Sequence, residues 1–236
     1  MLVVGPSRAA EVKDGDTIIL DDKSFKLDGI DAPERDQVCL DENCAVWACG
    51  IVARDRLTAL IGKRDVRCDD KGPDRAYRNS KRRVGVCWVE GESLSLNQLL
   101  VREGWALNFE PYAKGRFKAD QADAENNRRG LWKGCFSNPD DHRRGKKSTA
   151  PLLGAACSCS AAKSARDSLF PDDAAMPPGC PIKGKFALRA KITGHLGIYH
   201  LPGCRSYQRT KSPDRWFCSE EDAQADEFRK AYTCPK

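Results

Sequence analysis

VKDGDTIILDDKSFKLDGIDAPE, residues 12–34, is the stretch that decides the fold of the first part of this chain. It predicts two short strands, TIIL at 17–20 and SFKL at 24–27, separated by a polar turn at residues 21–23. The strands and the turn together predict a β-hairpin. An acidic motif lies on each side of the hairpin, so the same segment also carries a chemical signal.

Asp16 and Asp31 stand at the ends of these adjacent strands. Their carboxylates can therefore converge on one hard cation, since oxygen ligands suit calcium or magnesium. Asp-Gly sequences are also typical of ordinary turns, and either motif alone favours a simple acidic turn. Both motifs at this spacing, followed by a basic loop and helices, favour a cation site.

Residues 71–83 contain six Lys and Arg side chains and one acidic residue, Asp74. Such a cluster is suited to holding phosphate groups, and a solvated loop is the alternative. The formal net charge of +6 says less, because residues 1–135 carry 23 basic and 23 acidic residues. The surplus lies in RRGKK at 143–147 and in the C-terminal part.

The remainder of the first part predicts further strands and then helices. Helical spacing of apolar residues begins at Val46 and Trp47 and ends at Gly62. Two later helices end at Gly104 and Gly130. The fold class is therefore mainly β plus α, and short strands around inserted helices favour a small closed barrel of the OB type. The further predicted strands are VRC at 66–68 and VGVCWV at 84–89, and the later helices cover 94–103 and 117–129.

The chain divides into three parts by composition. Residues 10–136 form the predicted barrel domain, and residues 137–180, rich in charged and small residues, form a predicted linker. Residues 181–236 form a small cysteine-rich α+β module, with a final helix that begins at Ser219 and has Asp222 in a loose capping box.

Six stretches of the first part, in order, resemble the staphylococcal nuclease (thermonuclease) family over nearly all of residues 1–136. They are VKDGDT, KLDGIDAPE, WACGIVARDRLTALIGKRDVRC, RVGVCWV, SLNQLLVREGWA and AENNRRGLW. The resemblance implies a five-stranded OB-fold barrel with three helices. It also implies calcium-dependent hydrolysis of phosphodiester bonds in DNA and RNA.

The resemblance also implies roles for individual residues. Asp16, Asp31 and the Ala32 carbonyl match the family's metal ligands, and Asp14 would support them. Glu34 matches the proposed general base, which takes a proton from the attacking water.

The phosphate-binding positions depart from the family pattern. Lys26 stands where the family has its first arginine, which keeps the charge but loses the bidentate fork. Registration of the following strand selects Arg82 as the second arginine, whereas the tyrosine-arginine element selects Arg78; we favour Arg82. Arg75, Arg78 and Lys81 would then guide the substrate backbone, with Tyr112 near the base pocket.

Twelve cysteines favour disulfides in an oxidising compartment, metal sites or both. We expect bridges around Cys68 and Cys87 and around Cys39 and Cys49, with buried free thiols as the alternative. The sequence as given shows neither a membrane span nor a signal peptide. We therefore expect a periplasmic or secreted protein whose true start lies upstream of the given one.

The C-terminal part resembles a short domain often appended to nuclease-like and cell-surface bacterial proteins. It also bears a faint resemblance to the zinc-binding module of a bacterial alkyl-transfer DNA repair protein. His200, Cys204, Cys218 and Cys234 have spacings that suit a four-ligand zinc site. Disulfides among the cysteines, with His200 merely packed, are the slightly favoured alternative.

The sequence thus predicts a monomeric, calcium-dependent endonuclease that acts on DNA, RNA or both. A nuclease fold that only binds nucleic acid is the second hypothesis, because Lys26 and the irregular loop before Arg82 weaken the phosphate grip. An envelope accessory protein near polysaccharide machinery is the third.

Overall fold

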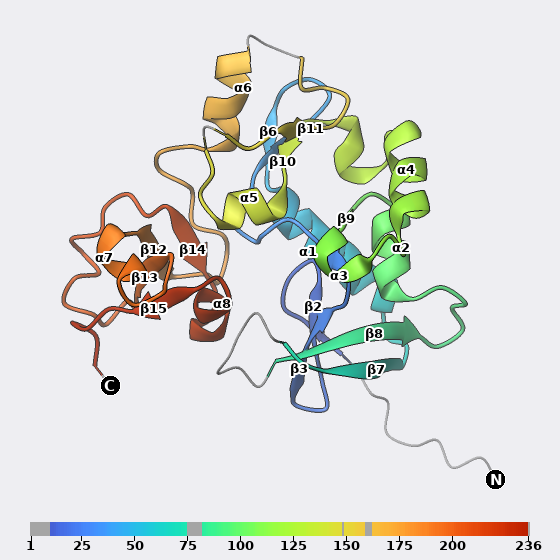
Figure 1. Cartoon of the computed structure of the whole chain (residues 1–236), viewed down its shortest axis with the longest axis horizontal. Helices are drawn as coiled ribbons and strands as arrows, with labels where there is room; N and C mark the ends of the chain where they lie inside the picture. Colours follow the sequence, from blue (N-terminus) through green and yellow to red (C-terminus); the bar gives the residue numbers. More distant parts are fainter. Residues whose placement is uncertain (1–9, 75–81, 148, 159–161, 236) are drawn as a thin grey trace.

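The structure is a computed structural model that describes residues 10–74, 82–147, 149–158 and 162–235 (Figure 1). Arg75, Arg78 and Lys81, the predicted substrate-guiding residues, lie outside these ranges. Within them, none of the helices is long and apolar enough to cross a membrane.

The first part is built on a five-stranded sheet with the order β1-β2-β3-β8-β7. Neighbouring strands are antiparallel except β3 and β8, which are parallel. The predicted hairpin is confirmed, and its turn holds Asp21 and Asp22 at positive φ, a conformation that Asp tolerates better than most residues. Among the described pairings none joins β7 to β1, so the sheet has five strands but closure into a barrel is not seen. The strands are β1 (Glu11–Val12), β2 (Thr17–Leu20), β3 (Lys23–Leu27), β7 (Val66–Pro73) and β8 (Arg83–Val89).

The three predicted helices are present as α1 (Cys49–Ile61), α2 (Leu96–Arg102) and α4 (Lys118–Asn126). The first begins later than its apolar spacing predicts. Val46 and Trp47 instead form β6 (Val46–Trp47), which pairs with β5 (Cys39–Leu40). Trp47 then packs edge-on against Trp105, with ring centroids 6.3 Å apart. Tertiary pairing thus overrides the local helical spacing.

One apolar core joins the sheet to α1 and α2. On β3 buried residues alternate with more exposed ones, as a half-buried sheet requires. Their side chains meet the buried faces of the helices. The core includes Ile18, Phe25, Leu27, Leu57, Ile61, Val66, Val89, Leu96 and Leu100.

The segment predicted as a linker carries structure of its own. It contains β10 (Phe136–Ser137), α5 (Pro139–Arg143), β11 (Leu152–Leu153) and α6 (Ala162–Leu169). Four of its apolar side chains are buried with Leu40 and Cys135 from the first part. A segment too poor in apolar residues to fold alone is therefore ordered by packing on its neighbour. The buried members from this segment are Ala150, Ala165, Leu169 and Phe170.

The C-terminal part is a four-stranded sheet with the order β14-β12-β13-β15, flanked by two short helices (Figure 1). Ser219 caps the last helix as predicted, because its Oγ accepts a hydrogen bond from the Asp222 amide at 3.1 Å. This helix ends earlier than predicted, and Phe228 begins a strand that pairs in parallel with β13. The elements are β12 (Ile182–Phe186), α7 (Leu188–Lys191), β13 (Gly197–His200), β14 (Arg215–Phe217), α8 (Glu220–Ala225) and β15 (Phe228–Lys230).

Five disulfides join described residues, and the predicted bridges Cys39–Cys49 and Cys68–Cys87 are among them. Cys68 and Cys87 are register partners on β7 and β8, which places their side chains on the same face. The other three are Cys135–Cys157, Cys180–Cys218 and Cys204–Cys234.

The zinc alternative for the C-terminal part is wrong. Cys204, Cys218 and Cys234 are all in disulfides, so they have no thiolate to offer a metal. The Nδ1 atom of His200 instead lies 2.7 Å from the Ser206 hydroxyl. The disulfide alternative is the one that the structure bears out.

Candidate active site

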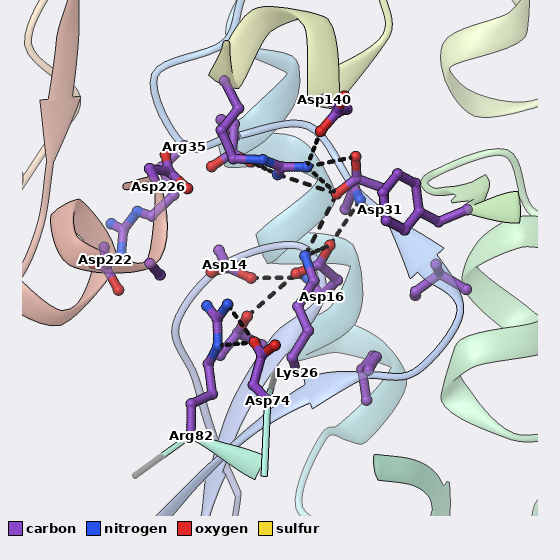
Figure 2. Close-up of a pocket in the computed structure, with 18 of the residues that line it drawn as sticks. Asp14, Asp16, Lys26, Asp31, Arg35, Asp74, Arg82, Asp140, Asp222 and Asp226 are labelled. Atoms are coloured by element: carbon purple, nitrogen blue, oxygen red, sulfur yellow. Dashed lines mark hydrogen bonds and ion pairs between the residues drawn. The ribbon is translucent and has the colours of Figure 1, made fainter. Parts of the chain in front are cut away.

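A cavity of about 380 Å³ lies between the N-terminal and C-terminal sheets. It brings together every described residue that the sequence marked for the nuclease site: Asp16, Lys26, Asp31, Ala32, Glu34, Arg82 and Tyr112. Residues of the segment after the nuclease-like part and of the C-terminal sheet line its other side. Figure 2 shows the acidic groups converging on this space, with Asp222 and Asp226 facing it from α8 and the turn that follows.

The hairpin and the turn after it set the positions of the acidic residues. Asp16 immediately precedes β2, and Lys26 on β3 is the register partner of Thr17, so the two side chains start close together. Asp31 ends β4 (Ile30–Asp31), which pairs with β9 (Leu107–Asn108). The β4–β9 pairing therefore fixes the second carboxylate near the first.

Helix α1 fixes the loop that carries Glu34. A side chain added at Gly50 would place its Cβ 1.7 Å from the Glu34 carbonyl oxygen. Only glycine therefore allows this close approach between the helix and the loop. Glu34 itself lines the cavity.

Lys26 lies between the two predicted metal carboxylates. Its Nζ is 2.5 Å from Asp16 Oδ2 and 3.5 Å from Asp31 Oδ1. Asp16 Oδ2 also accepts a hydrogen bond from the Ala32 amide at 2.8 Å. The ammonium group is thus shared by the two carboxylates that would hold a cation (Figure 2).

Burial and charge act in opposite directions on these groups. Burial alone would lower the pKa of Lys26, and Asp16 and Asp31 outweigh it, so the pKa is raised. Burial alone would raise the pKa of Asp16, and Lys26 with the Ala32 amide outweighs it, so the pKa is lowered. For Asp31, burial prevails over Arg143 and Lys26, and the pKa is raised. The pKa of Asp14 is raised well above its usual value by burial and by the charge of Asp16.

Glu34 is held by two arginines that the sequence prediction missed. Arg143 of α5 donates through NH1 to Glu34 Oε1, and Arg215 of β14 places NH2 at 3.5 Å from Glu34 Oε2. Arg143 also contacts Asp31, with NH2 at 3.0 Å from Oδ2. Both arginines come from outside the nuclease-like part, and only the RRGKK charge run hinted at the first.

Arg215 belongs to a buried ionic network that joins β14 to the loop after β4. Its Nε donates to Asp36 Oδ2 at 2.8 Å, and its NH2 lies 3.0 Å from Asp226 Oδ2. Asp36 also accepts from the Trp216 amide at 2.8 Å and lies 3.2 Å from His142 Nε2. Burial would raise the pKa of Asp36, and Arg215 outweighs it, so the pKa is lowered.

Arg82 and Tyr112 stand at the edge of the cavity. Arg82 NH2 lies 2.6 Å from Asp74 Oδ2, and its side chain is mostly buried (Figure 2). Tyr112, on α3 (Glu110–Ala113), is half-exposed, and its ring centroid is 5.6 Å from that of Phe109. Arg82, which registration of the following strand β8 selects as the second arginine, therefore lines the cavity.

The donor chemistry of the site fits a hard cation. Asp14, Asp16 and Asp31 offer only oxygen atoms, the donors that hard cations prefer, and all three line the cavity. Among the described residues, however, no three His, Cys, Asp or Glu side chains already form a metal-binding group. A cation would therefore have to displace Lys26 or Arg143 from these carboxylates.

Comparison with known proteins agrees with the motif order. Residues 24–134 match the model of the staphylococcal nuclease homologue family. These residues therefore form a staphylococcal-nuclease-like domain, and β2 and Asp16 lie just before the matched range. Arg143 and Arg215 lie outside the matched residues.

A curated relative is the succinoglycan biosynthesis protein ExoI of Rhizobium meliloti (strain 1021), which is 35% identical to this chain over 125 residues. The match covers 52% of this chain and 63% of the relative. The chain thus spans less than two thirds of that protein.

Proposed function

We propose that the protein is a calcium-dependent endonuclease that hydrolyses phosphodiester bonds of DNA or RNA. The observation that carries this proposal is the convergence of Asp16, Asp31 and Glu34 with Lys26 and Arg82 on one cavity. The match of residues 24–134 to nuclease homologues supports the same reaction class.

Each group has a role that follows from its chemistry. Asp16, Asp31 and the Ala32 carbonyl would hold the cation, which neutralises phosphate charge and polarises the attacking water. Glu34 accepts a proton from that water. Lys26 and Arg82 contact the non-bridging phosphate oxygens, where negative charge concentrates during phosphoryl transfer.

A digestion assay tests the proposal directly. The full chain is incubated with single-stranded DNA, duplex DNA and RNA, each with calcium and with a chelator. We expect internal cleavage that requires calcium. Intact substrate in every calcium reaction would refute the proposal.

A protein that binds nucleic acid without efficient cleavage is the second candidate, because Lys26 is already engaged by Asp16 and Asp31. Lys26→Arg restores the bidentate fork at this position. We expect kcat/KM to rise about tenfold, on the scale of one charge-assisted contact in the transition state. Unchanged kcat/KM would favour the binding role.

The name of the relative favours a third candidate, an accessory role in polysaccharide biosynthesis. The five disulfides support a periplasmic or extracellular location for any of these roles. Mass spectrometry of alkylated protein, with and without reductant, tests this location. Free thiols at these ten cysteines in protein isolated from its native host would contradict it.

A further inference from the structure

Arg143 is placed at the centre of the acidic site by a short, well-defined helix. Asn138 caps the start of α5, and its Oδ1 accepts a hydrogen bond from the Asp140 amide at 3.0 Å. Pro139 follows in the first turn, where proline is favoured. The helix ends at Arg143, whose side chain is 16% exposed and points into the cavity.

The Arg143 guanidinium contacts three carboxylates at once. Its NH1 lies 3.2 Å from Asp31 Oδ1 and also reaches Glu34 Oε1, and its NH2 lies 3.3 Å from Asp140 Oδ1. Arg143 and Lys26 therefore meet on the same oxygen of Asp31, at 3.2 and 3.5 Å. The planar Arg143 guanidinium thus lies beside Lys26, which stands where the family has its first arginine.

Through these contacts Arg143 occupies two groups that the proposed reaction needs, the cation ligand Asp31 and the general base Glu34. While Arg143 holds Asp31, it competes with a divalent cation for that carboxylate. While it holds Glu34, it occupies a carboxylate oxygen that would otherwise face the attacking water. A cation at Asp31 would release the guanidinium, and the substrate phosphate would offer it oxygen atoms in a suitable geometry.

We propose that Arg143 is a catalytic, phosphate-binding residue of this site. When substrate and cation bind, its guanidinium releases Asp31 and Glu34 and contacts the scissile phosphate. The proposal rests on the proposed function. In the reaction the water oxygen forms a bond to phosphorus and one ester P–O bond breaks. Glu34 takes one water proton, and the leaving oxygen gains a proton from solvent. Arg143 stays protonated throughout.

The first test measures calcium binding without nucleic acid. Isothermal titration calorimetry with calcium chloride compares the wild-type chain with Arg143→Ala and Arg143→Lys. We expect Arg143→Ala to lower the calcium Kd about tenfold, because a competing cation is removed from a buried carboxylate. A residue that only supported the fold would leave the calcium Kd unchanged or raise it.

The second test measures the phosphate contact. Binding of a phosphorothioate-linked DNA decamer in calcium is followed by fluorescence anisotropy, and cleavage of ordinary single-stranded DNA gives kcat and KM. We expect Arg143→Ala to weaken decamer binding and to lower kcat about 10²-fold, since the contact strengthens in the transition state. Arg143→Lys should recover part of kcat. Lys146→Ala, which removes an exposed ion pair with Asp141 just after α5, is the matched control.

The outcomes separate this proposal from the one on which it rests. Wild-type protein that cleaves nothing would refute the endonuclease function, whatever the variants do. Arg143→Ala with unchanged calcium Kd and unchanged decamer affinity would refute the role of Arg143, even in an active nuclease. Circular dichroism spectra and melting temperatures confirm that the compared variants are folded.

Discussion

At the scale of single residues, Glu34 is the group whose surroundings matter most for the proposed chemistry. One oxygen of its carboxylate is held by Arg143, and the other faces Arg215 at 3.5 Å. Both partners are cations, so each oxygen of the carboxylate already faces a positive charge when no substrate is bound. Activity therefore requires that substrate binding change these contacts.

The first prediction concerns Glu34→Gln. Glutamine has the same shape but cannot accept the proton from water, so we expect kcat to fall by about 10²–10⁴-fold. Calcium binding should persist, because Glu34 is not among the proposed ligands. Steady-state cleavage kinetics and calorimetry check the two parts, with Glu92→Gln, an exposed partner of Arg64, as the control. Turnover equal to that of the wild type would remove Glu34 from its role.

At the scale of elements, the sequence predicts what is encoded locally. The β2–β3 hairpin and the strands β7 and β8 follow from short apolar stretches and turns, and the hairpin alone brings Asp16 and Lys26 together. The order of the motifs then predicts that Asp31 and Glu34 belong to the same site.

The elements that differ from the prediction form through contacts between residues that are far apart in the sequence. Val46 and Trp47 have helical spacing, yet pairing with β5 makes them a strand. Arg143 and Arg215 reach Glu34 across 109 and 181 residues of chain. The RRGKK run marks positive charge at Arg143, but no local pattern connects either arginine with Glu34. Predicting them would require knowing that α5 and β14 pack against the nuclease-like part.

Strand β14 carries the second prediction, which concerns the stability of the fold. Arg215→Ala leaves Asp36 and Asp226 without their buried cation, and we expect the free energy of unfolding to fall by about 3–5 kcal/mol. Arg64→Ala removes an exposed ion pair with Glu92 and should cost less than about 1 kcal/mol. Urea unfolding of both variants checks the difference. Equal losses would show that the network contributes little.

At the scale of the whole molecule, the C-terminal sheet forms one wall of the candidate active site. Arg215 is not the only link between the walls. Lys13, in the first acidic motif, lies 3.0 Å from Glu221 and 3.2 Å from Asp222 of α8. Arg35 NH2 donates to the Pro178 carbonyl at 3.3 Å. Because ion pairs help to join the two walls, the stability of the folded protein depends on the charges of these groups.

Asp226 makes this link testable through pH. Burial, together with the charge of Glu34, raises its pKa to about 7, although Arg215 and Arg143 act in the opposite direction. The folded protein therefore holds a proton on Asp226 that the unfolded chain releases above its ordinary pKa near 4. Stability from this group is fully present below about pH 4, declines as the pH rises and is lost above about pH 7.

Asp226→Asn removes the titrating proton and keeps the shape of the side chain. We therefore expect its melting temperature, relative to wild type, to be higher at pH 8 than at pH 5. For a chain of this length, each kcal/mol of such a change corresponds to about 2–4 °C. Differential scanning fluorimetry at pH 5, 6, 7 and 8 gives the two curves. A difference between variant and wild type that is the same at every pH would show that Asp226 does not titrate between pH 5 and pH 8.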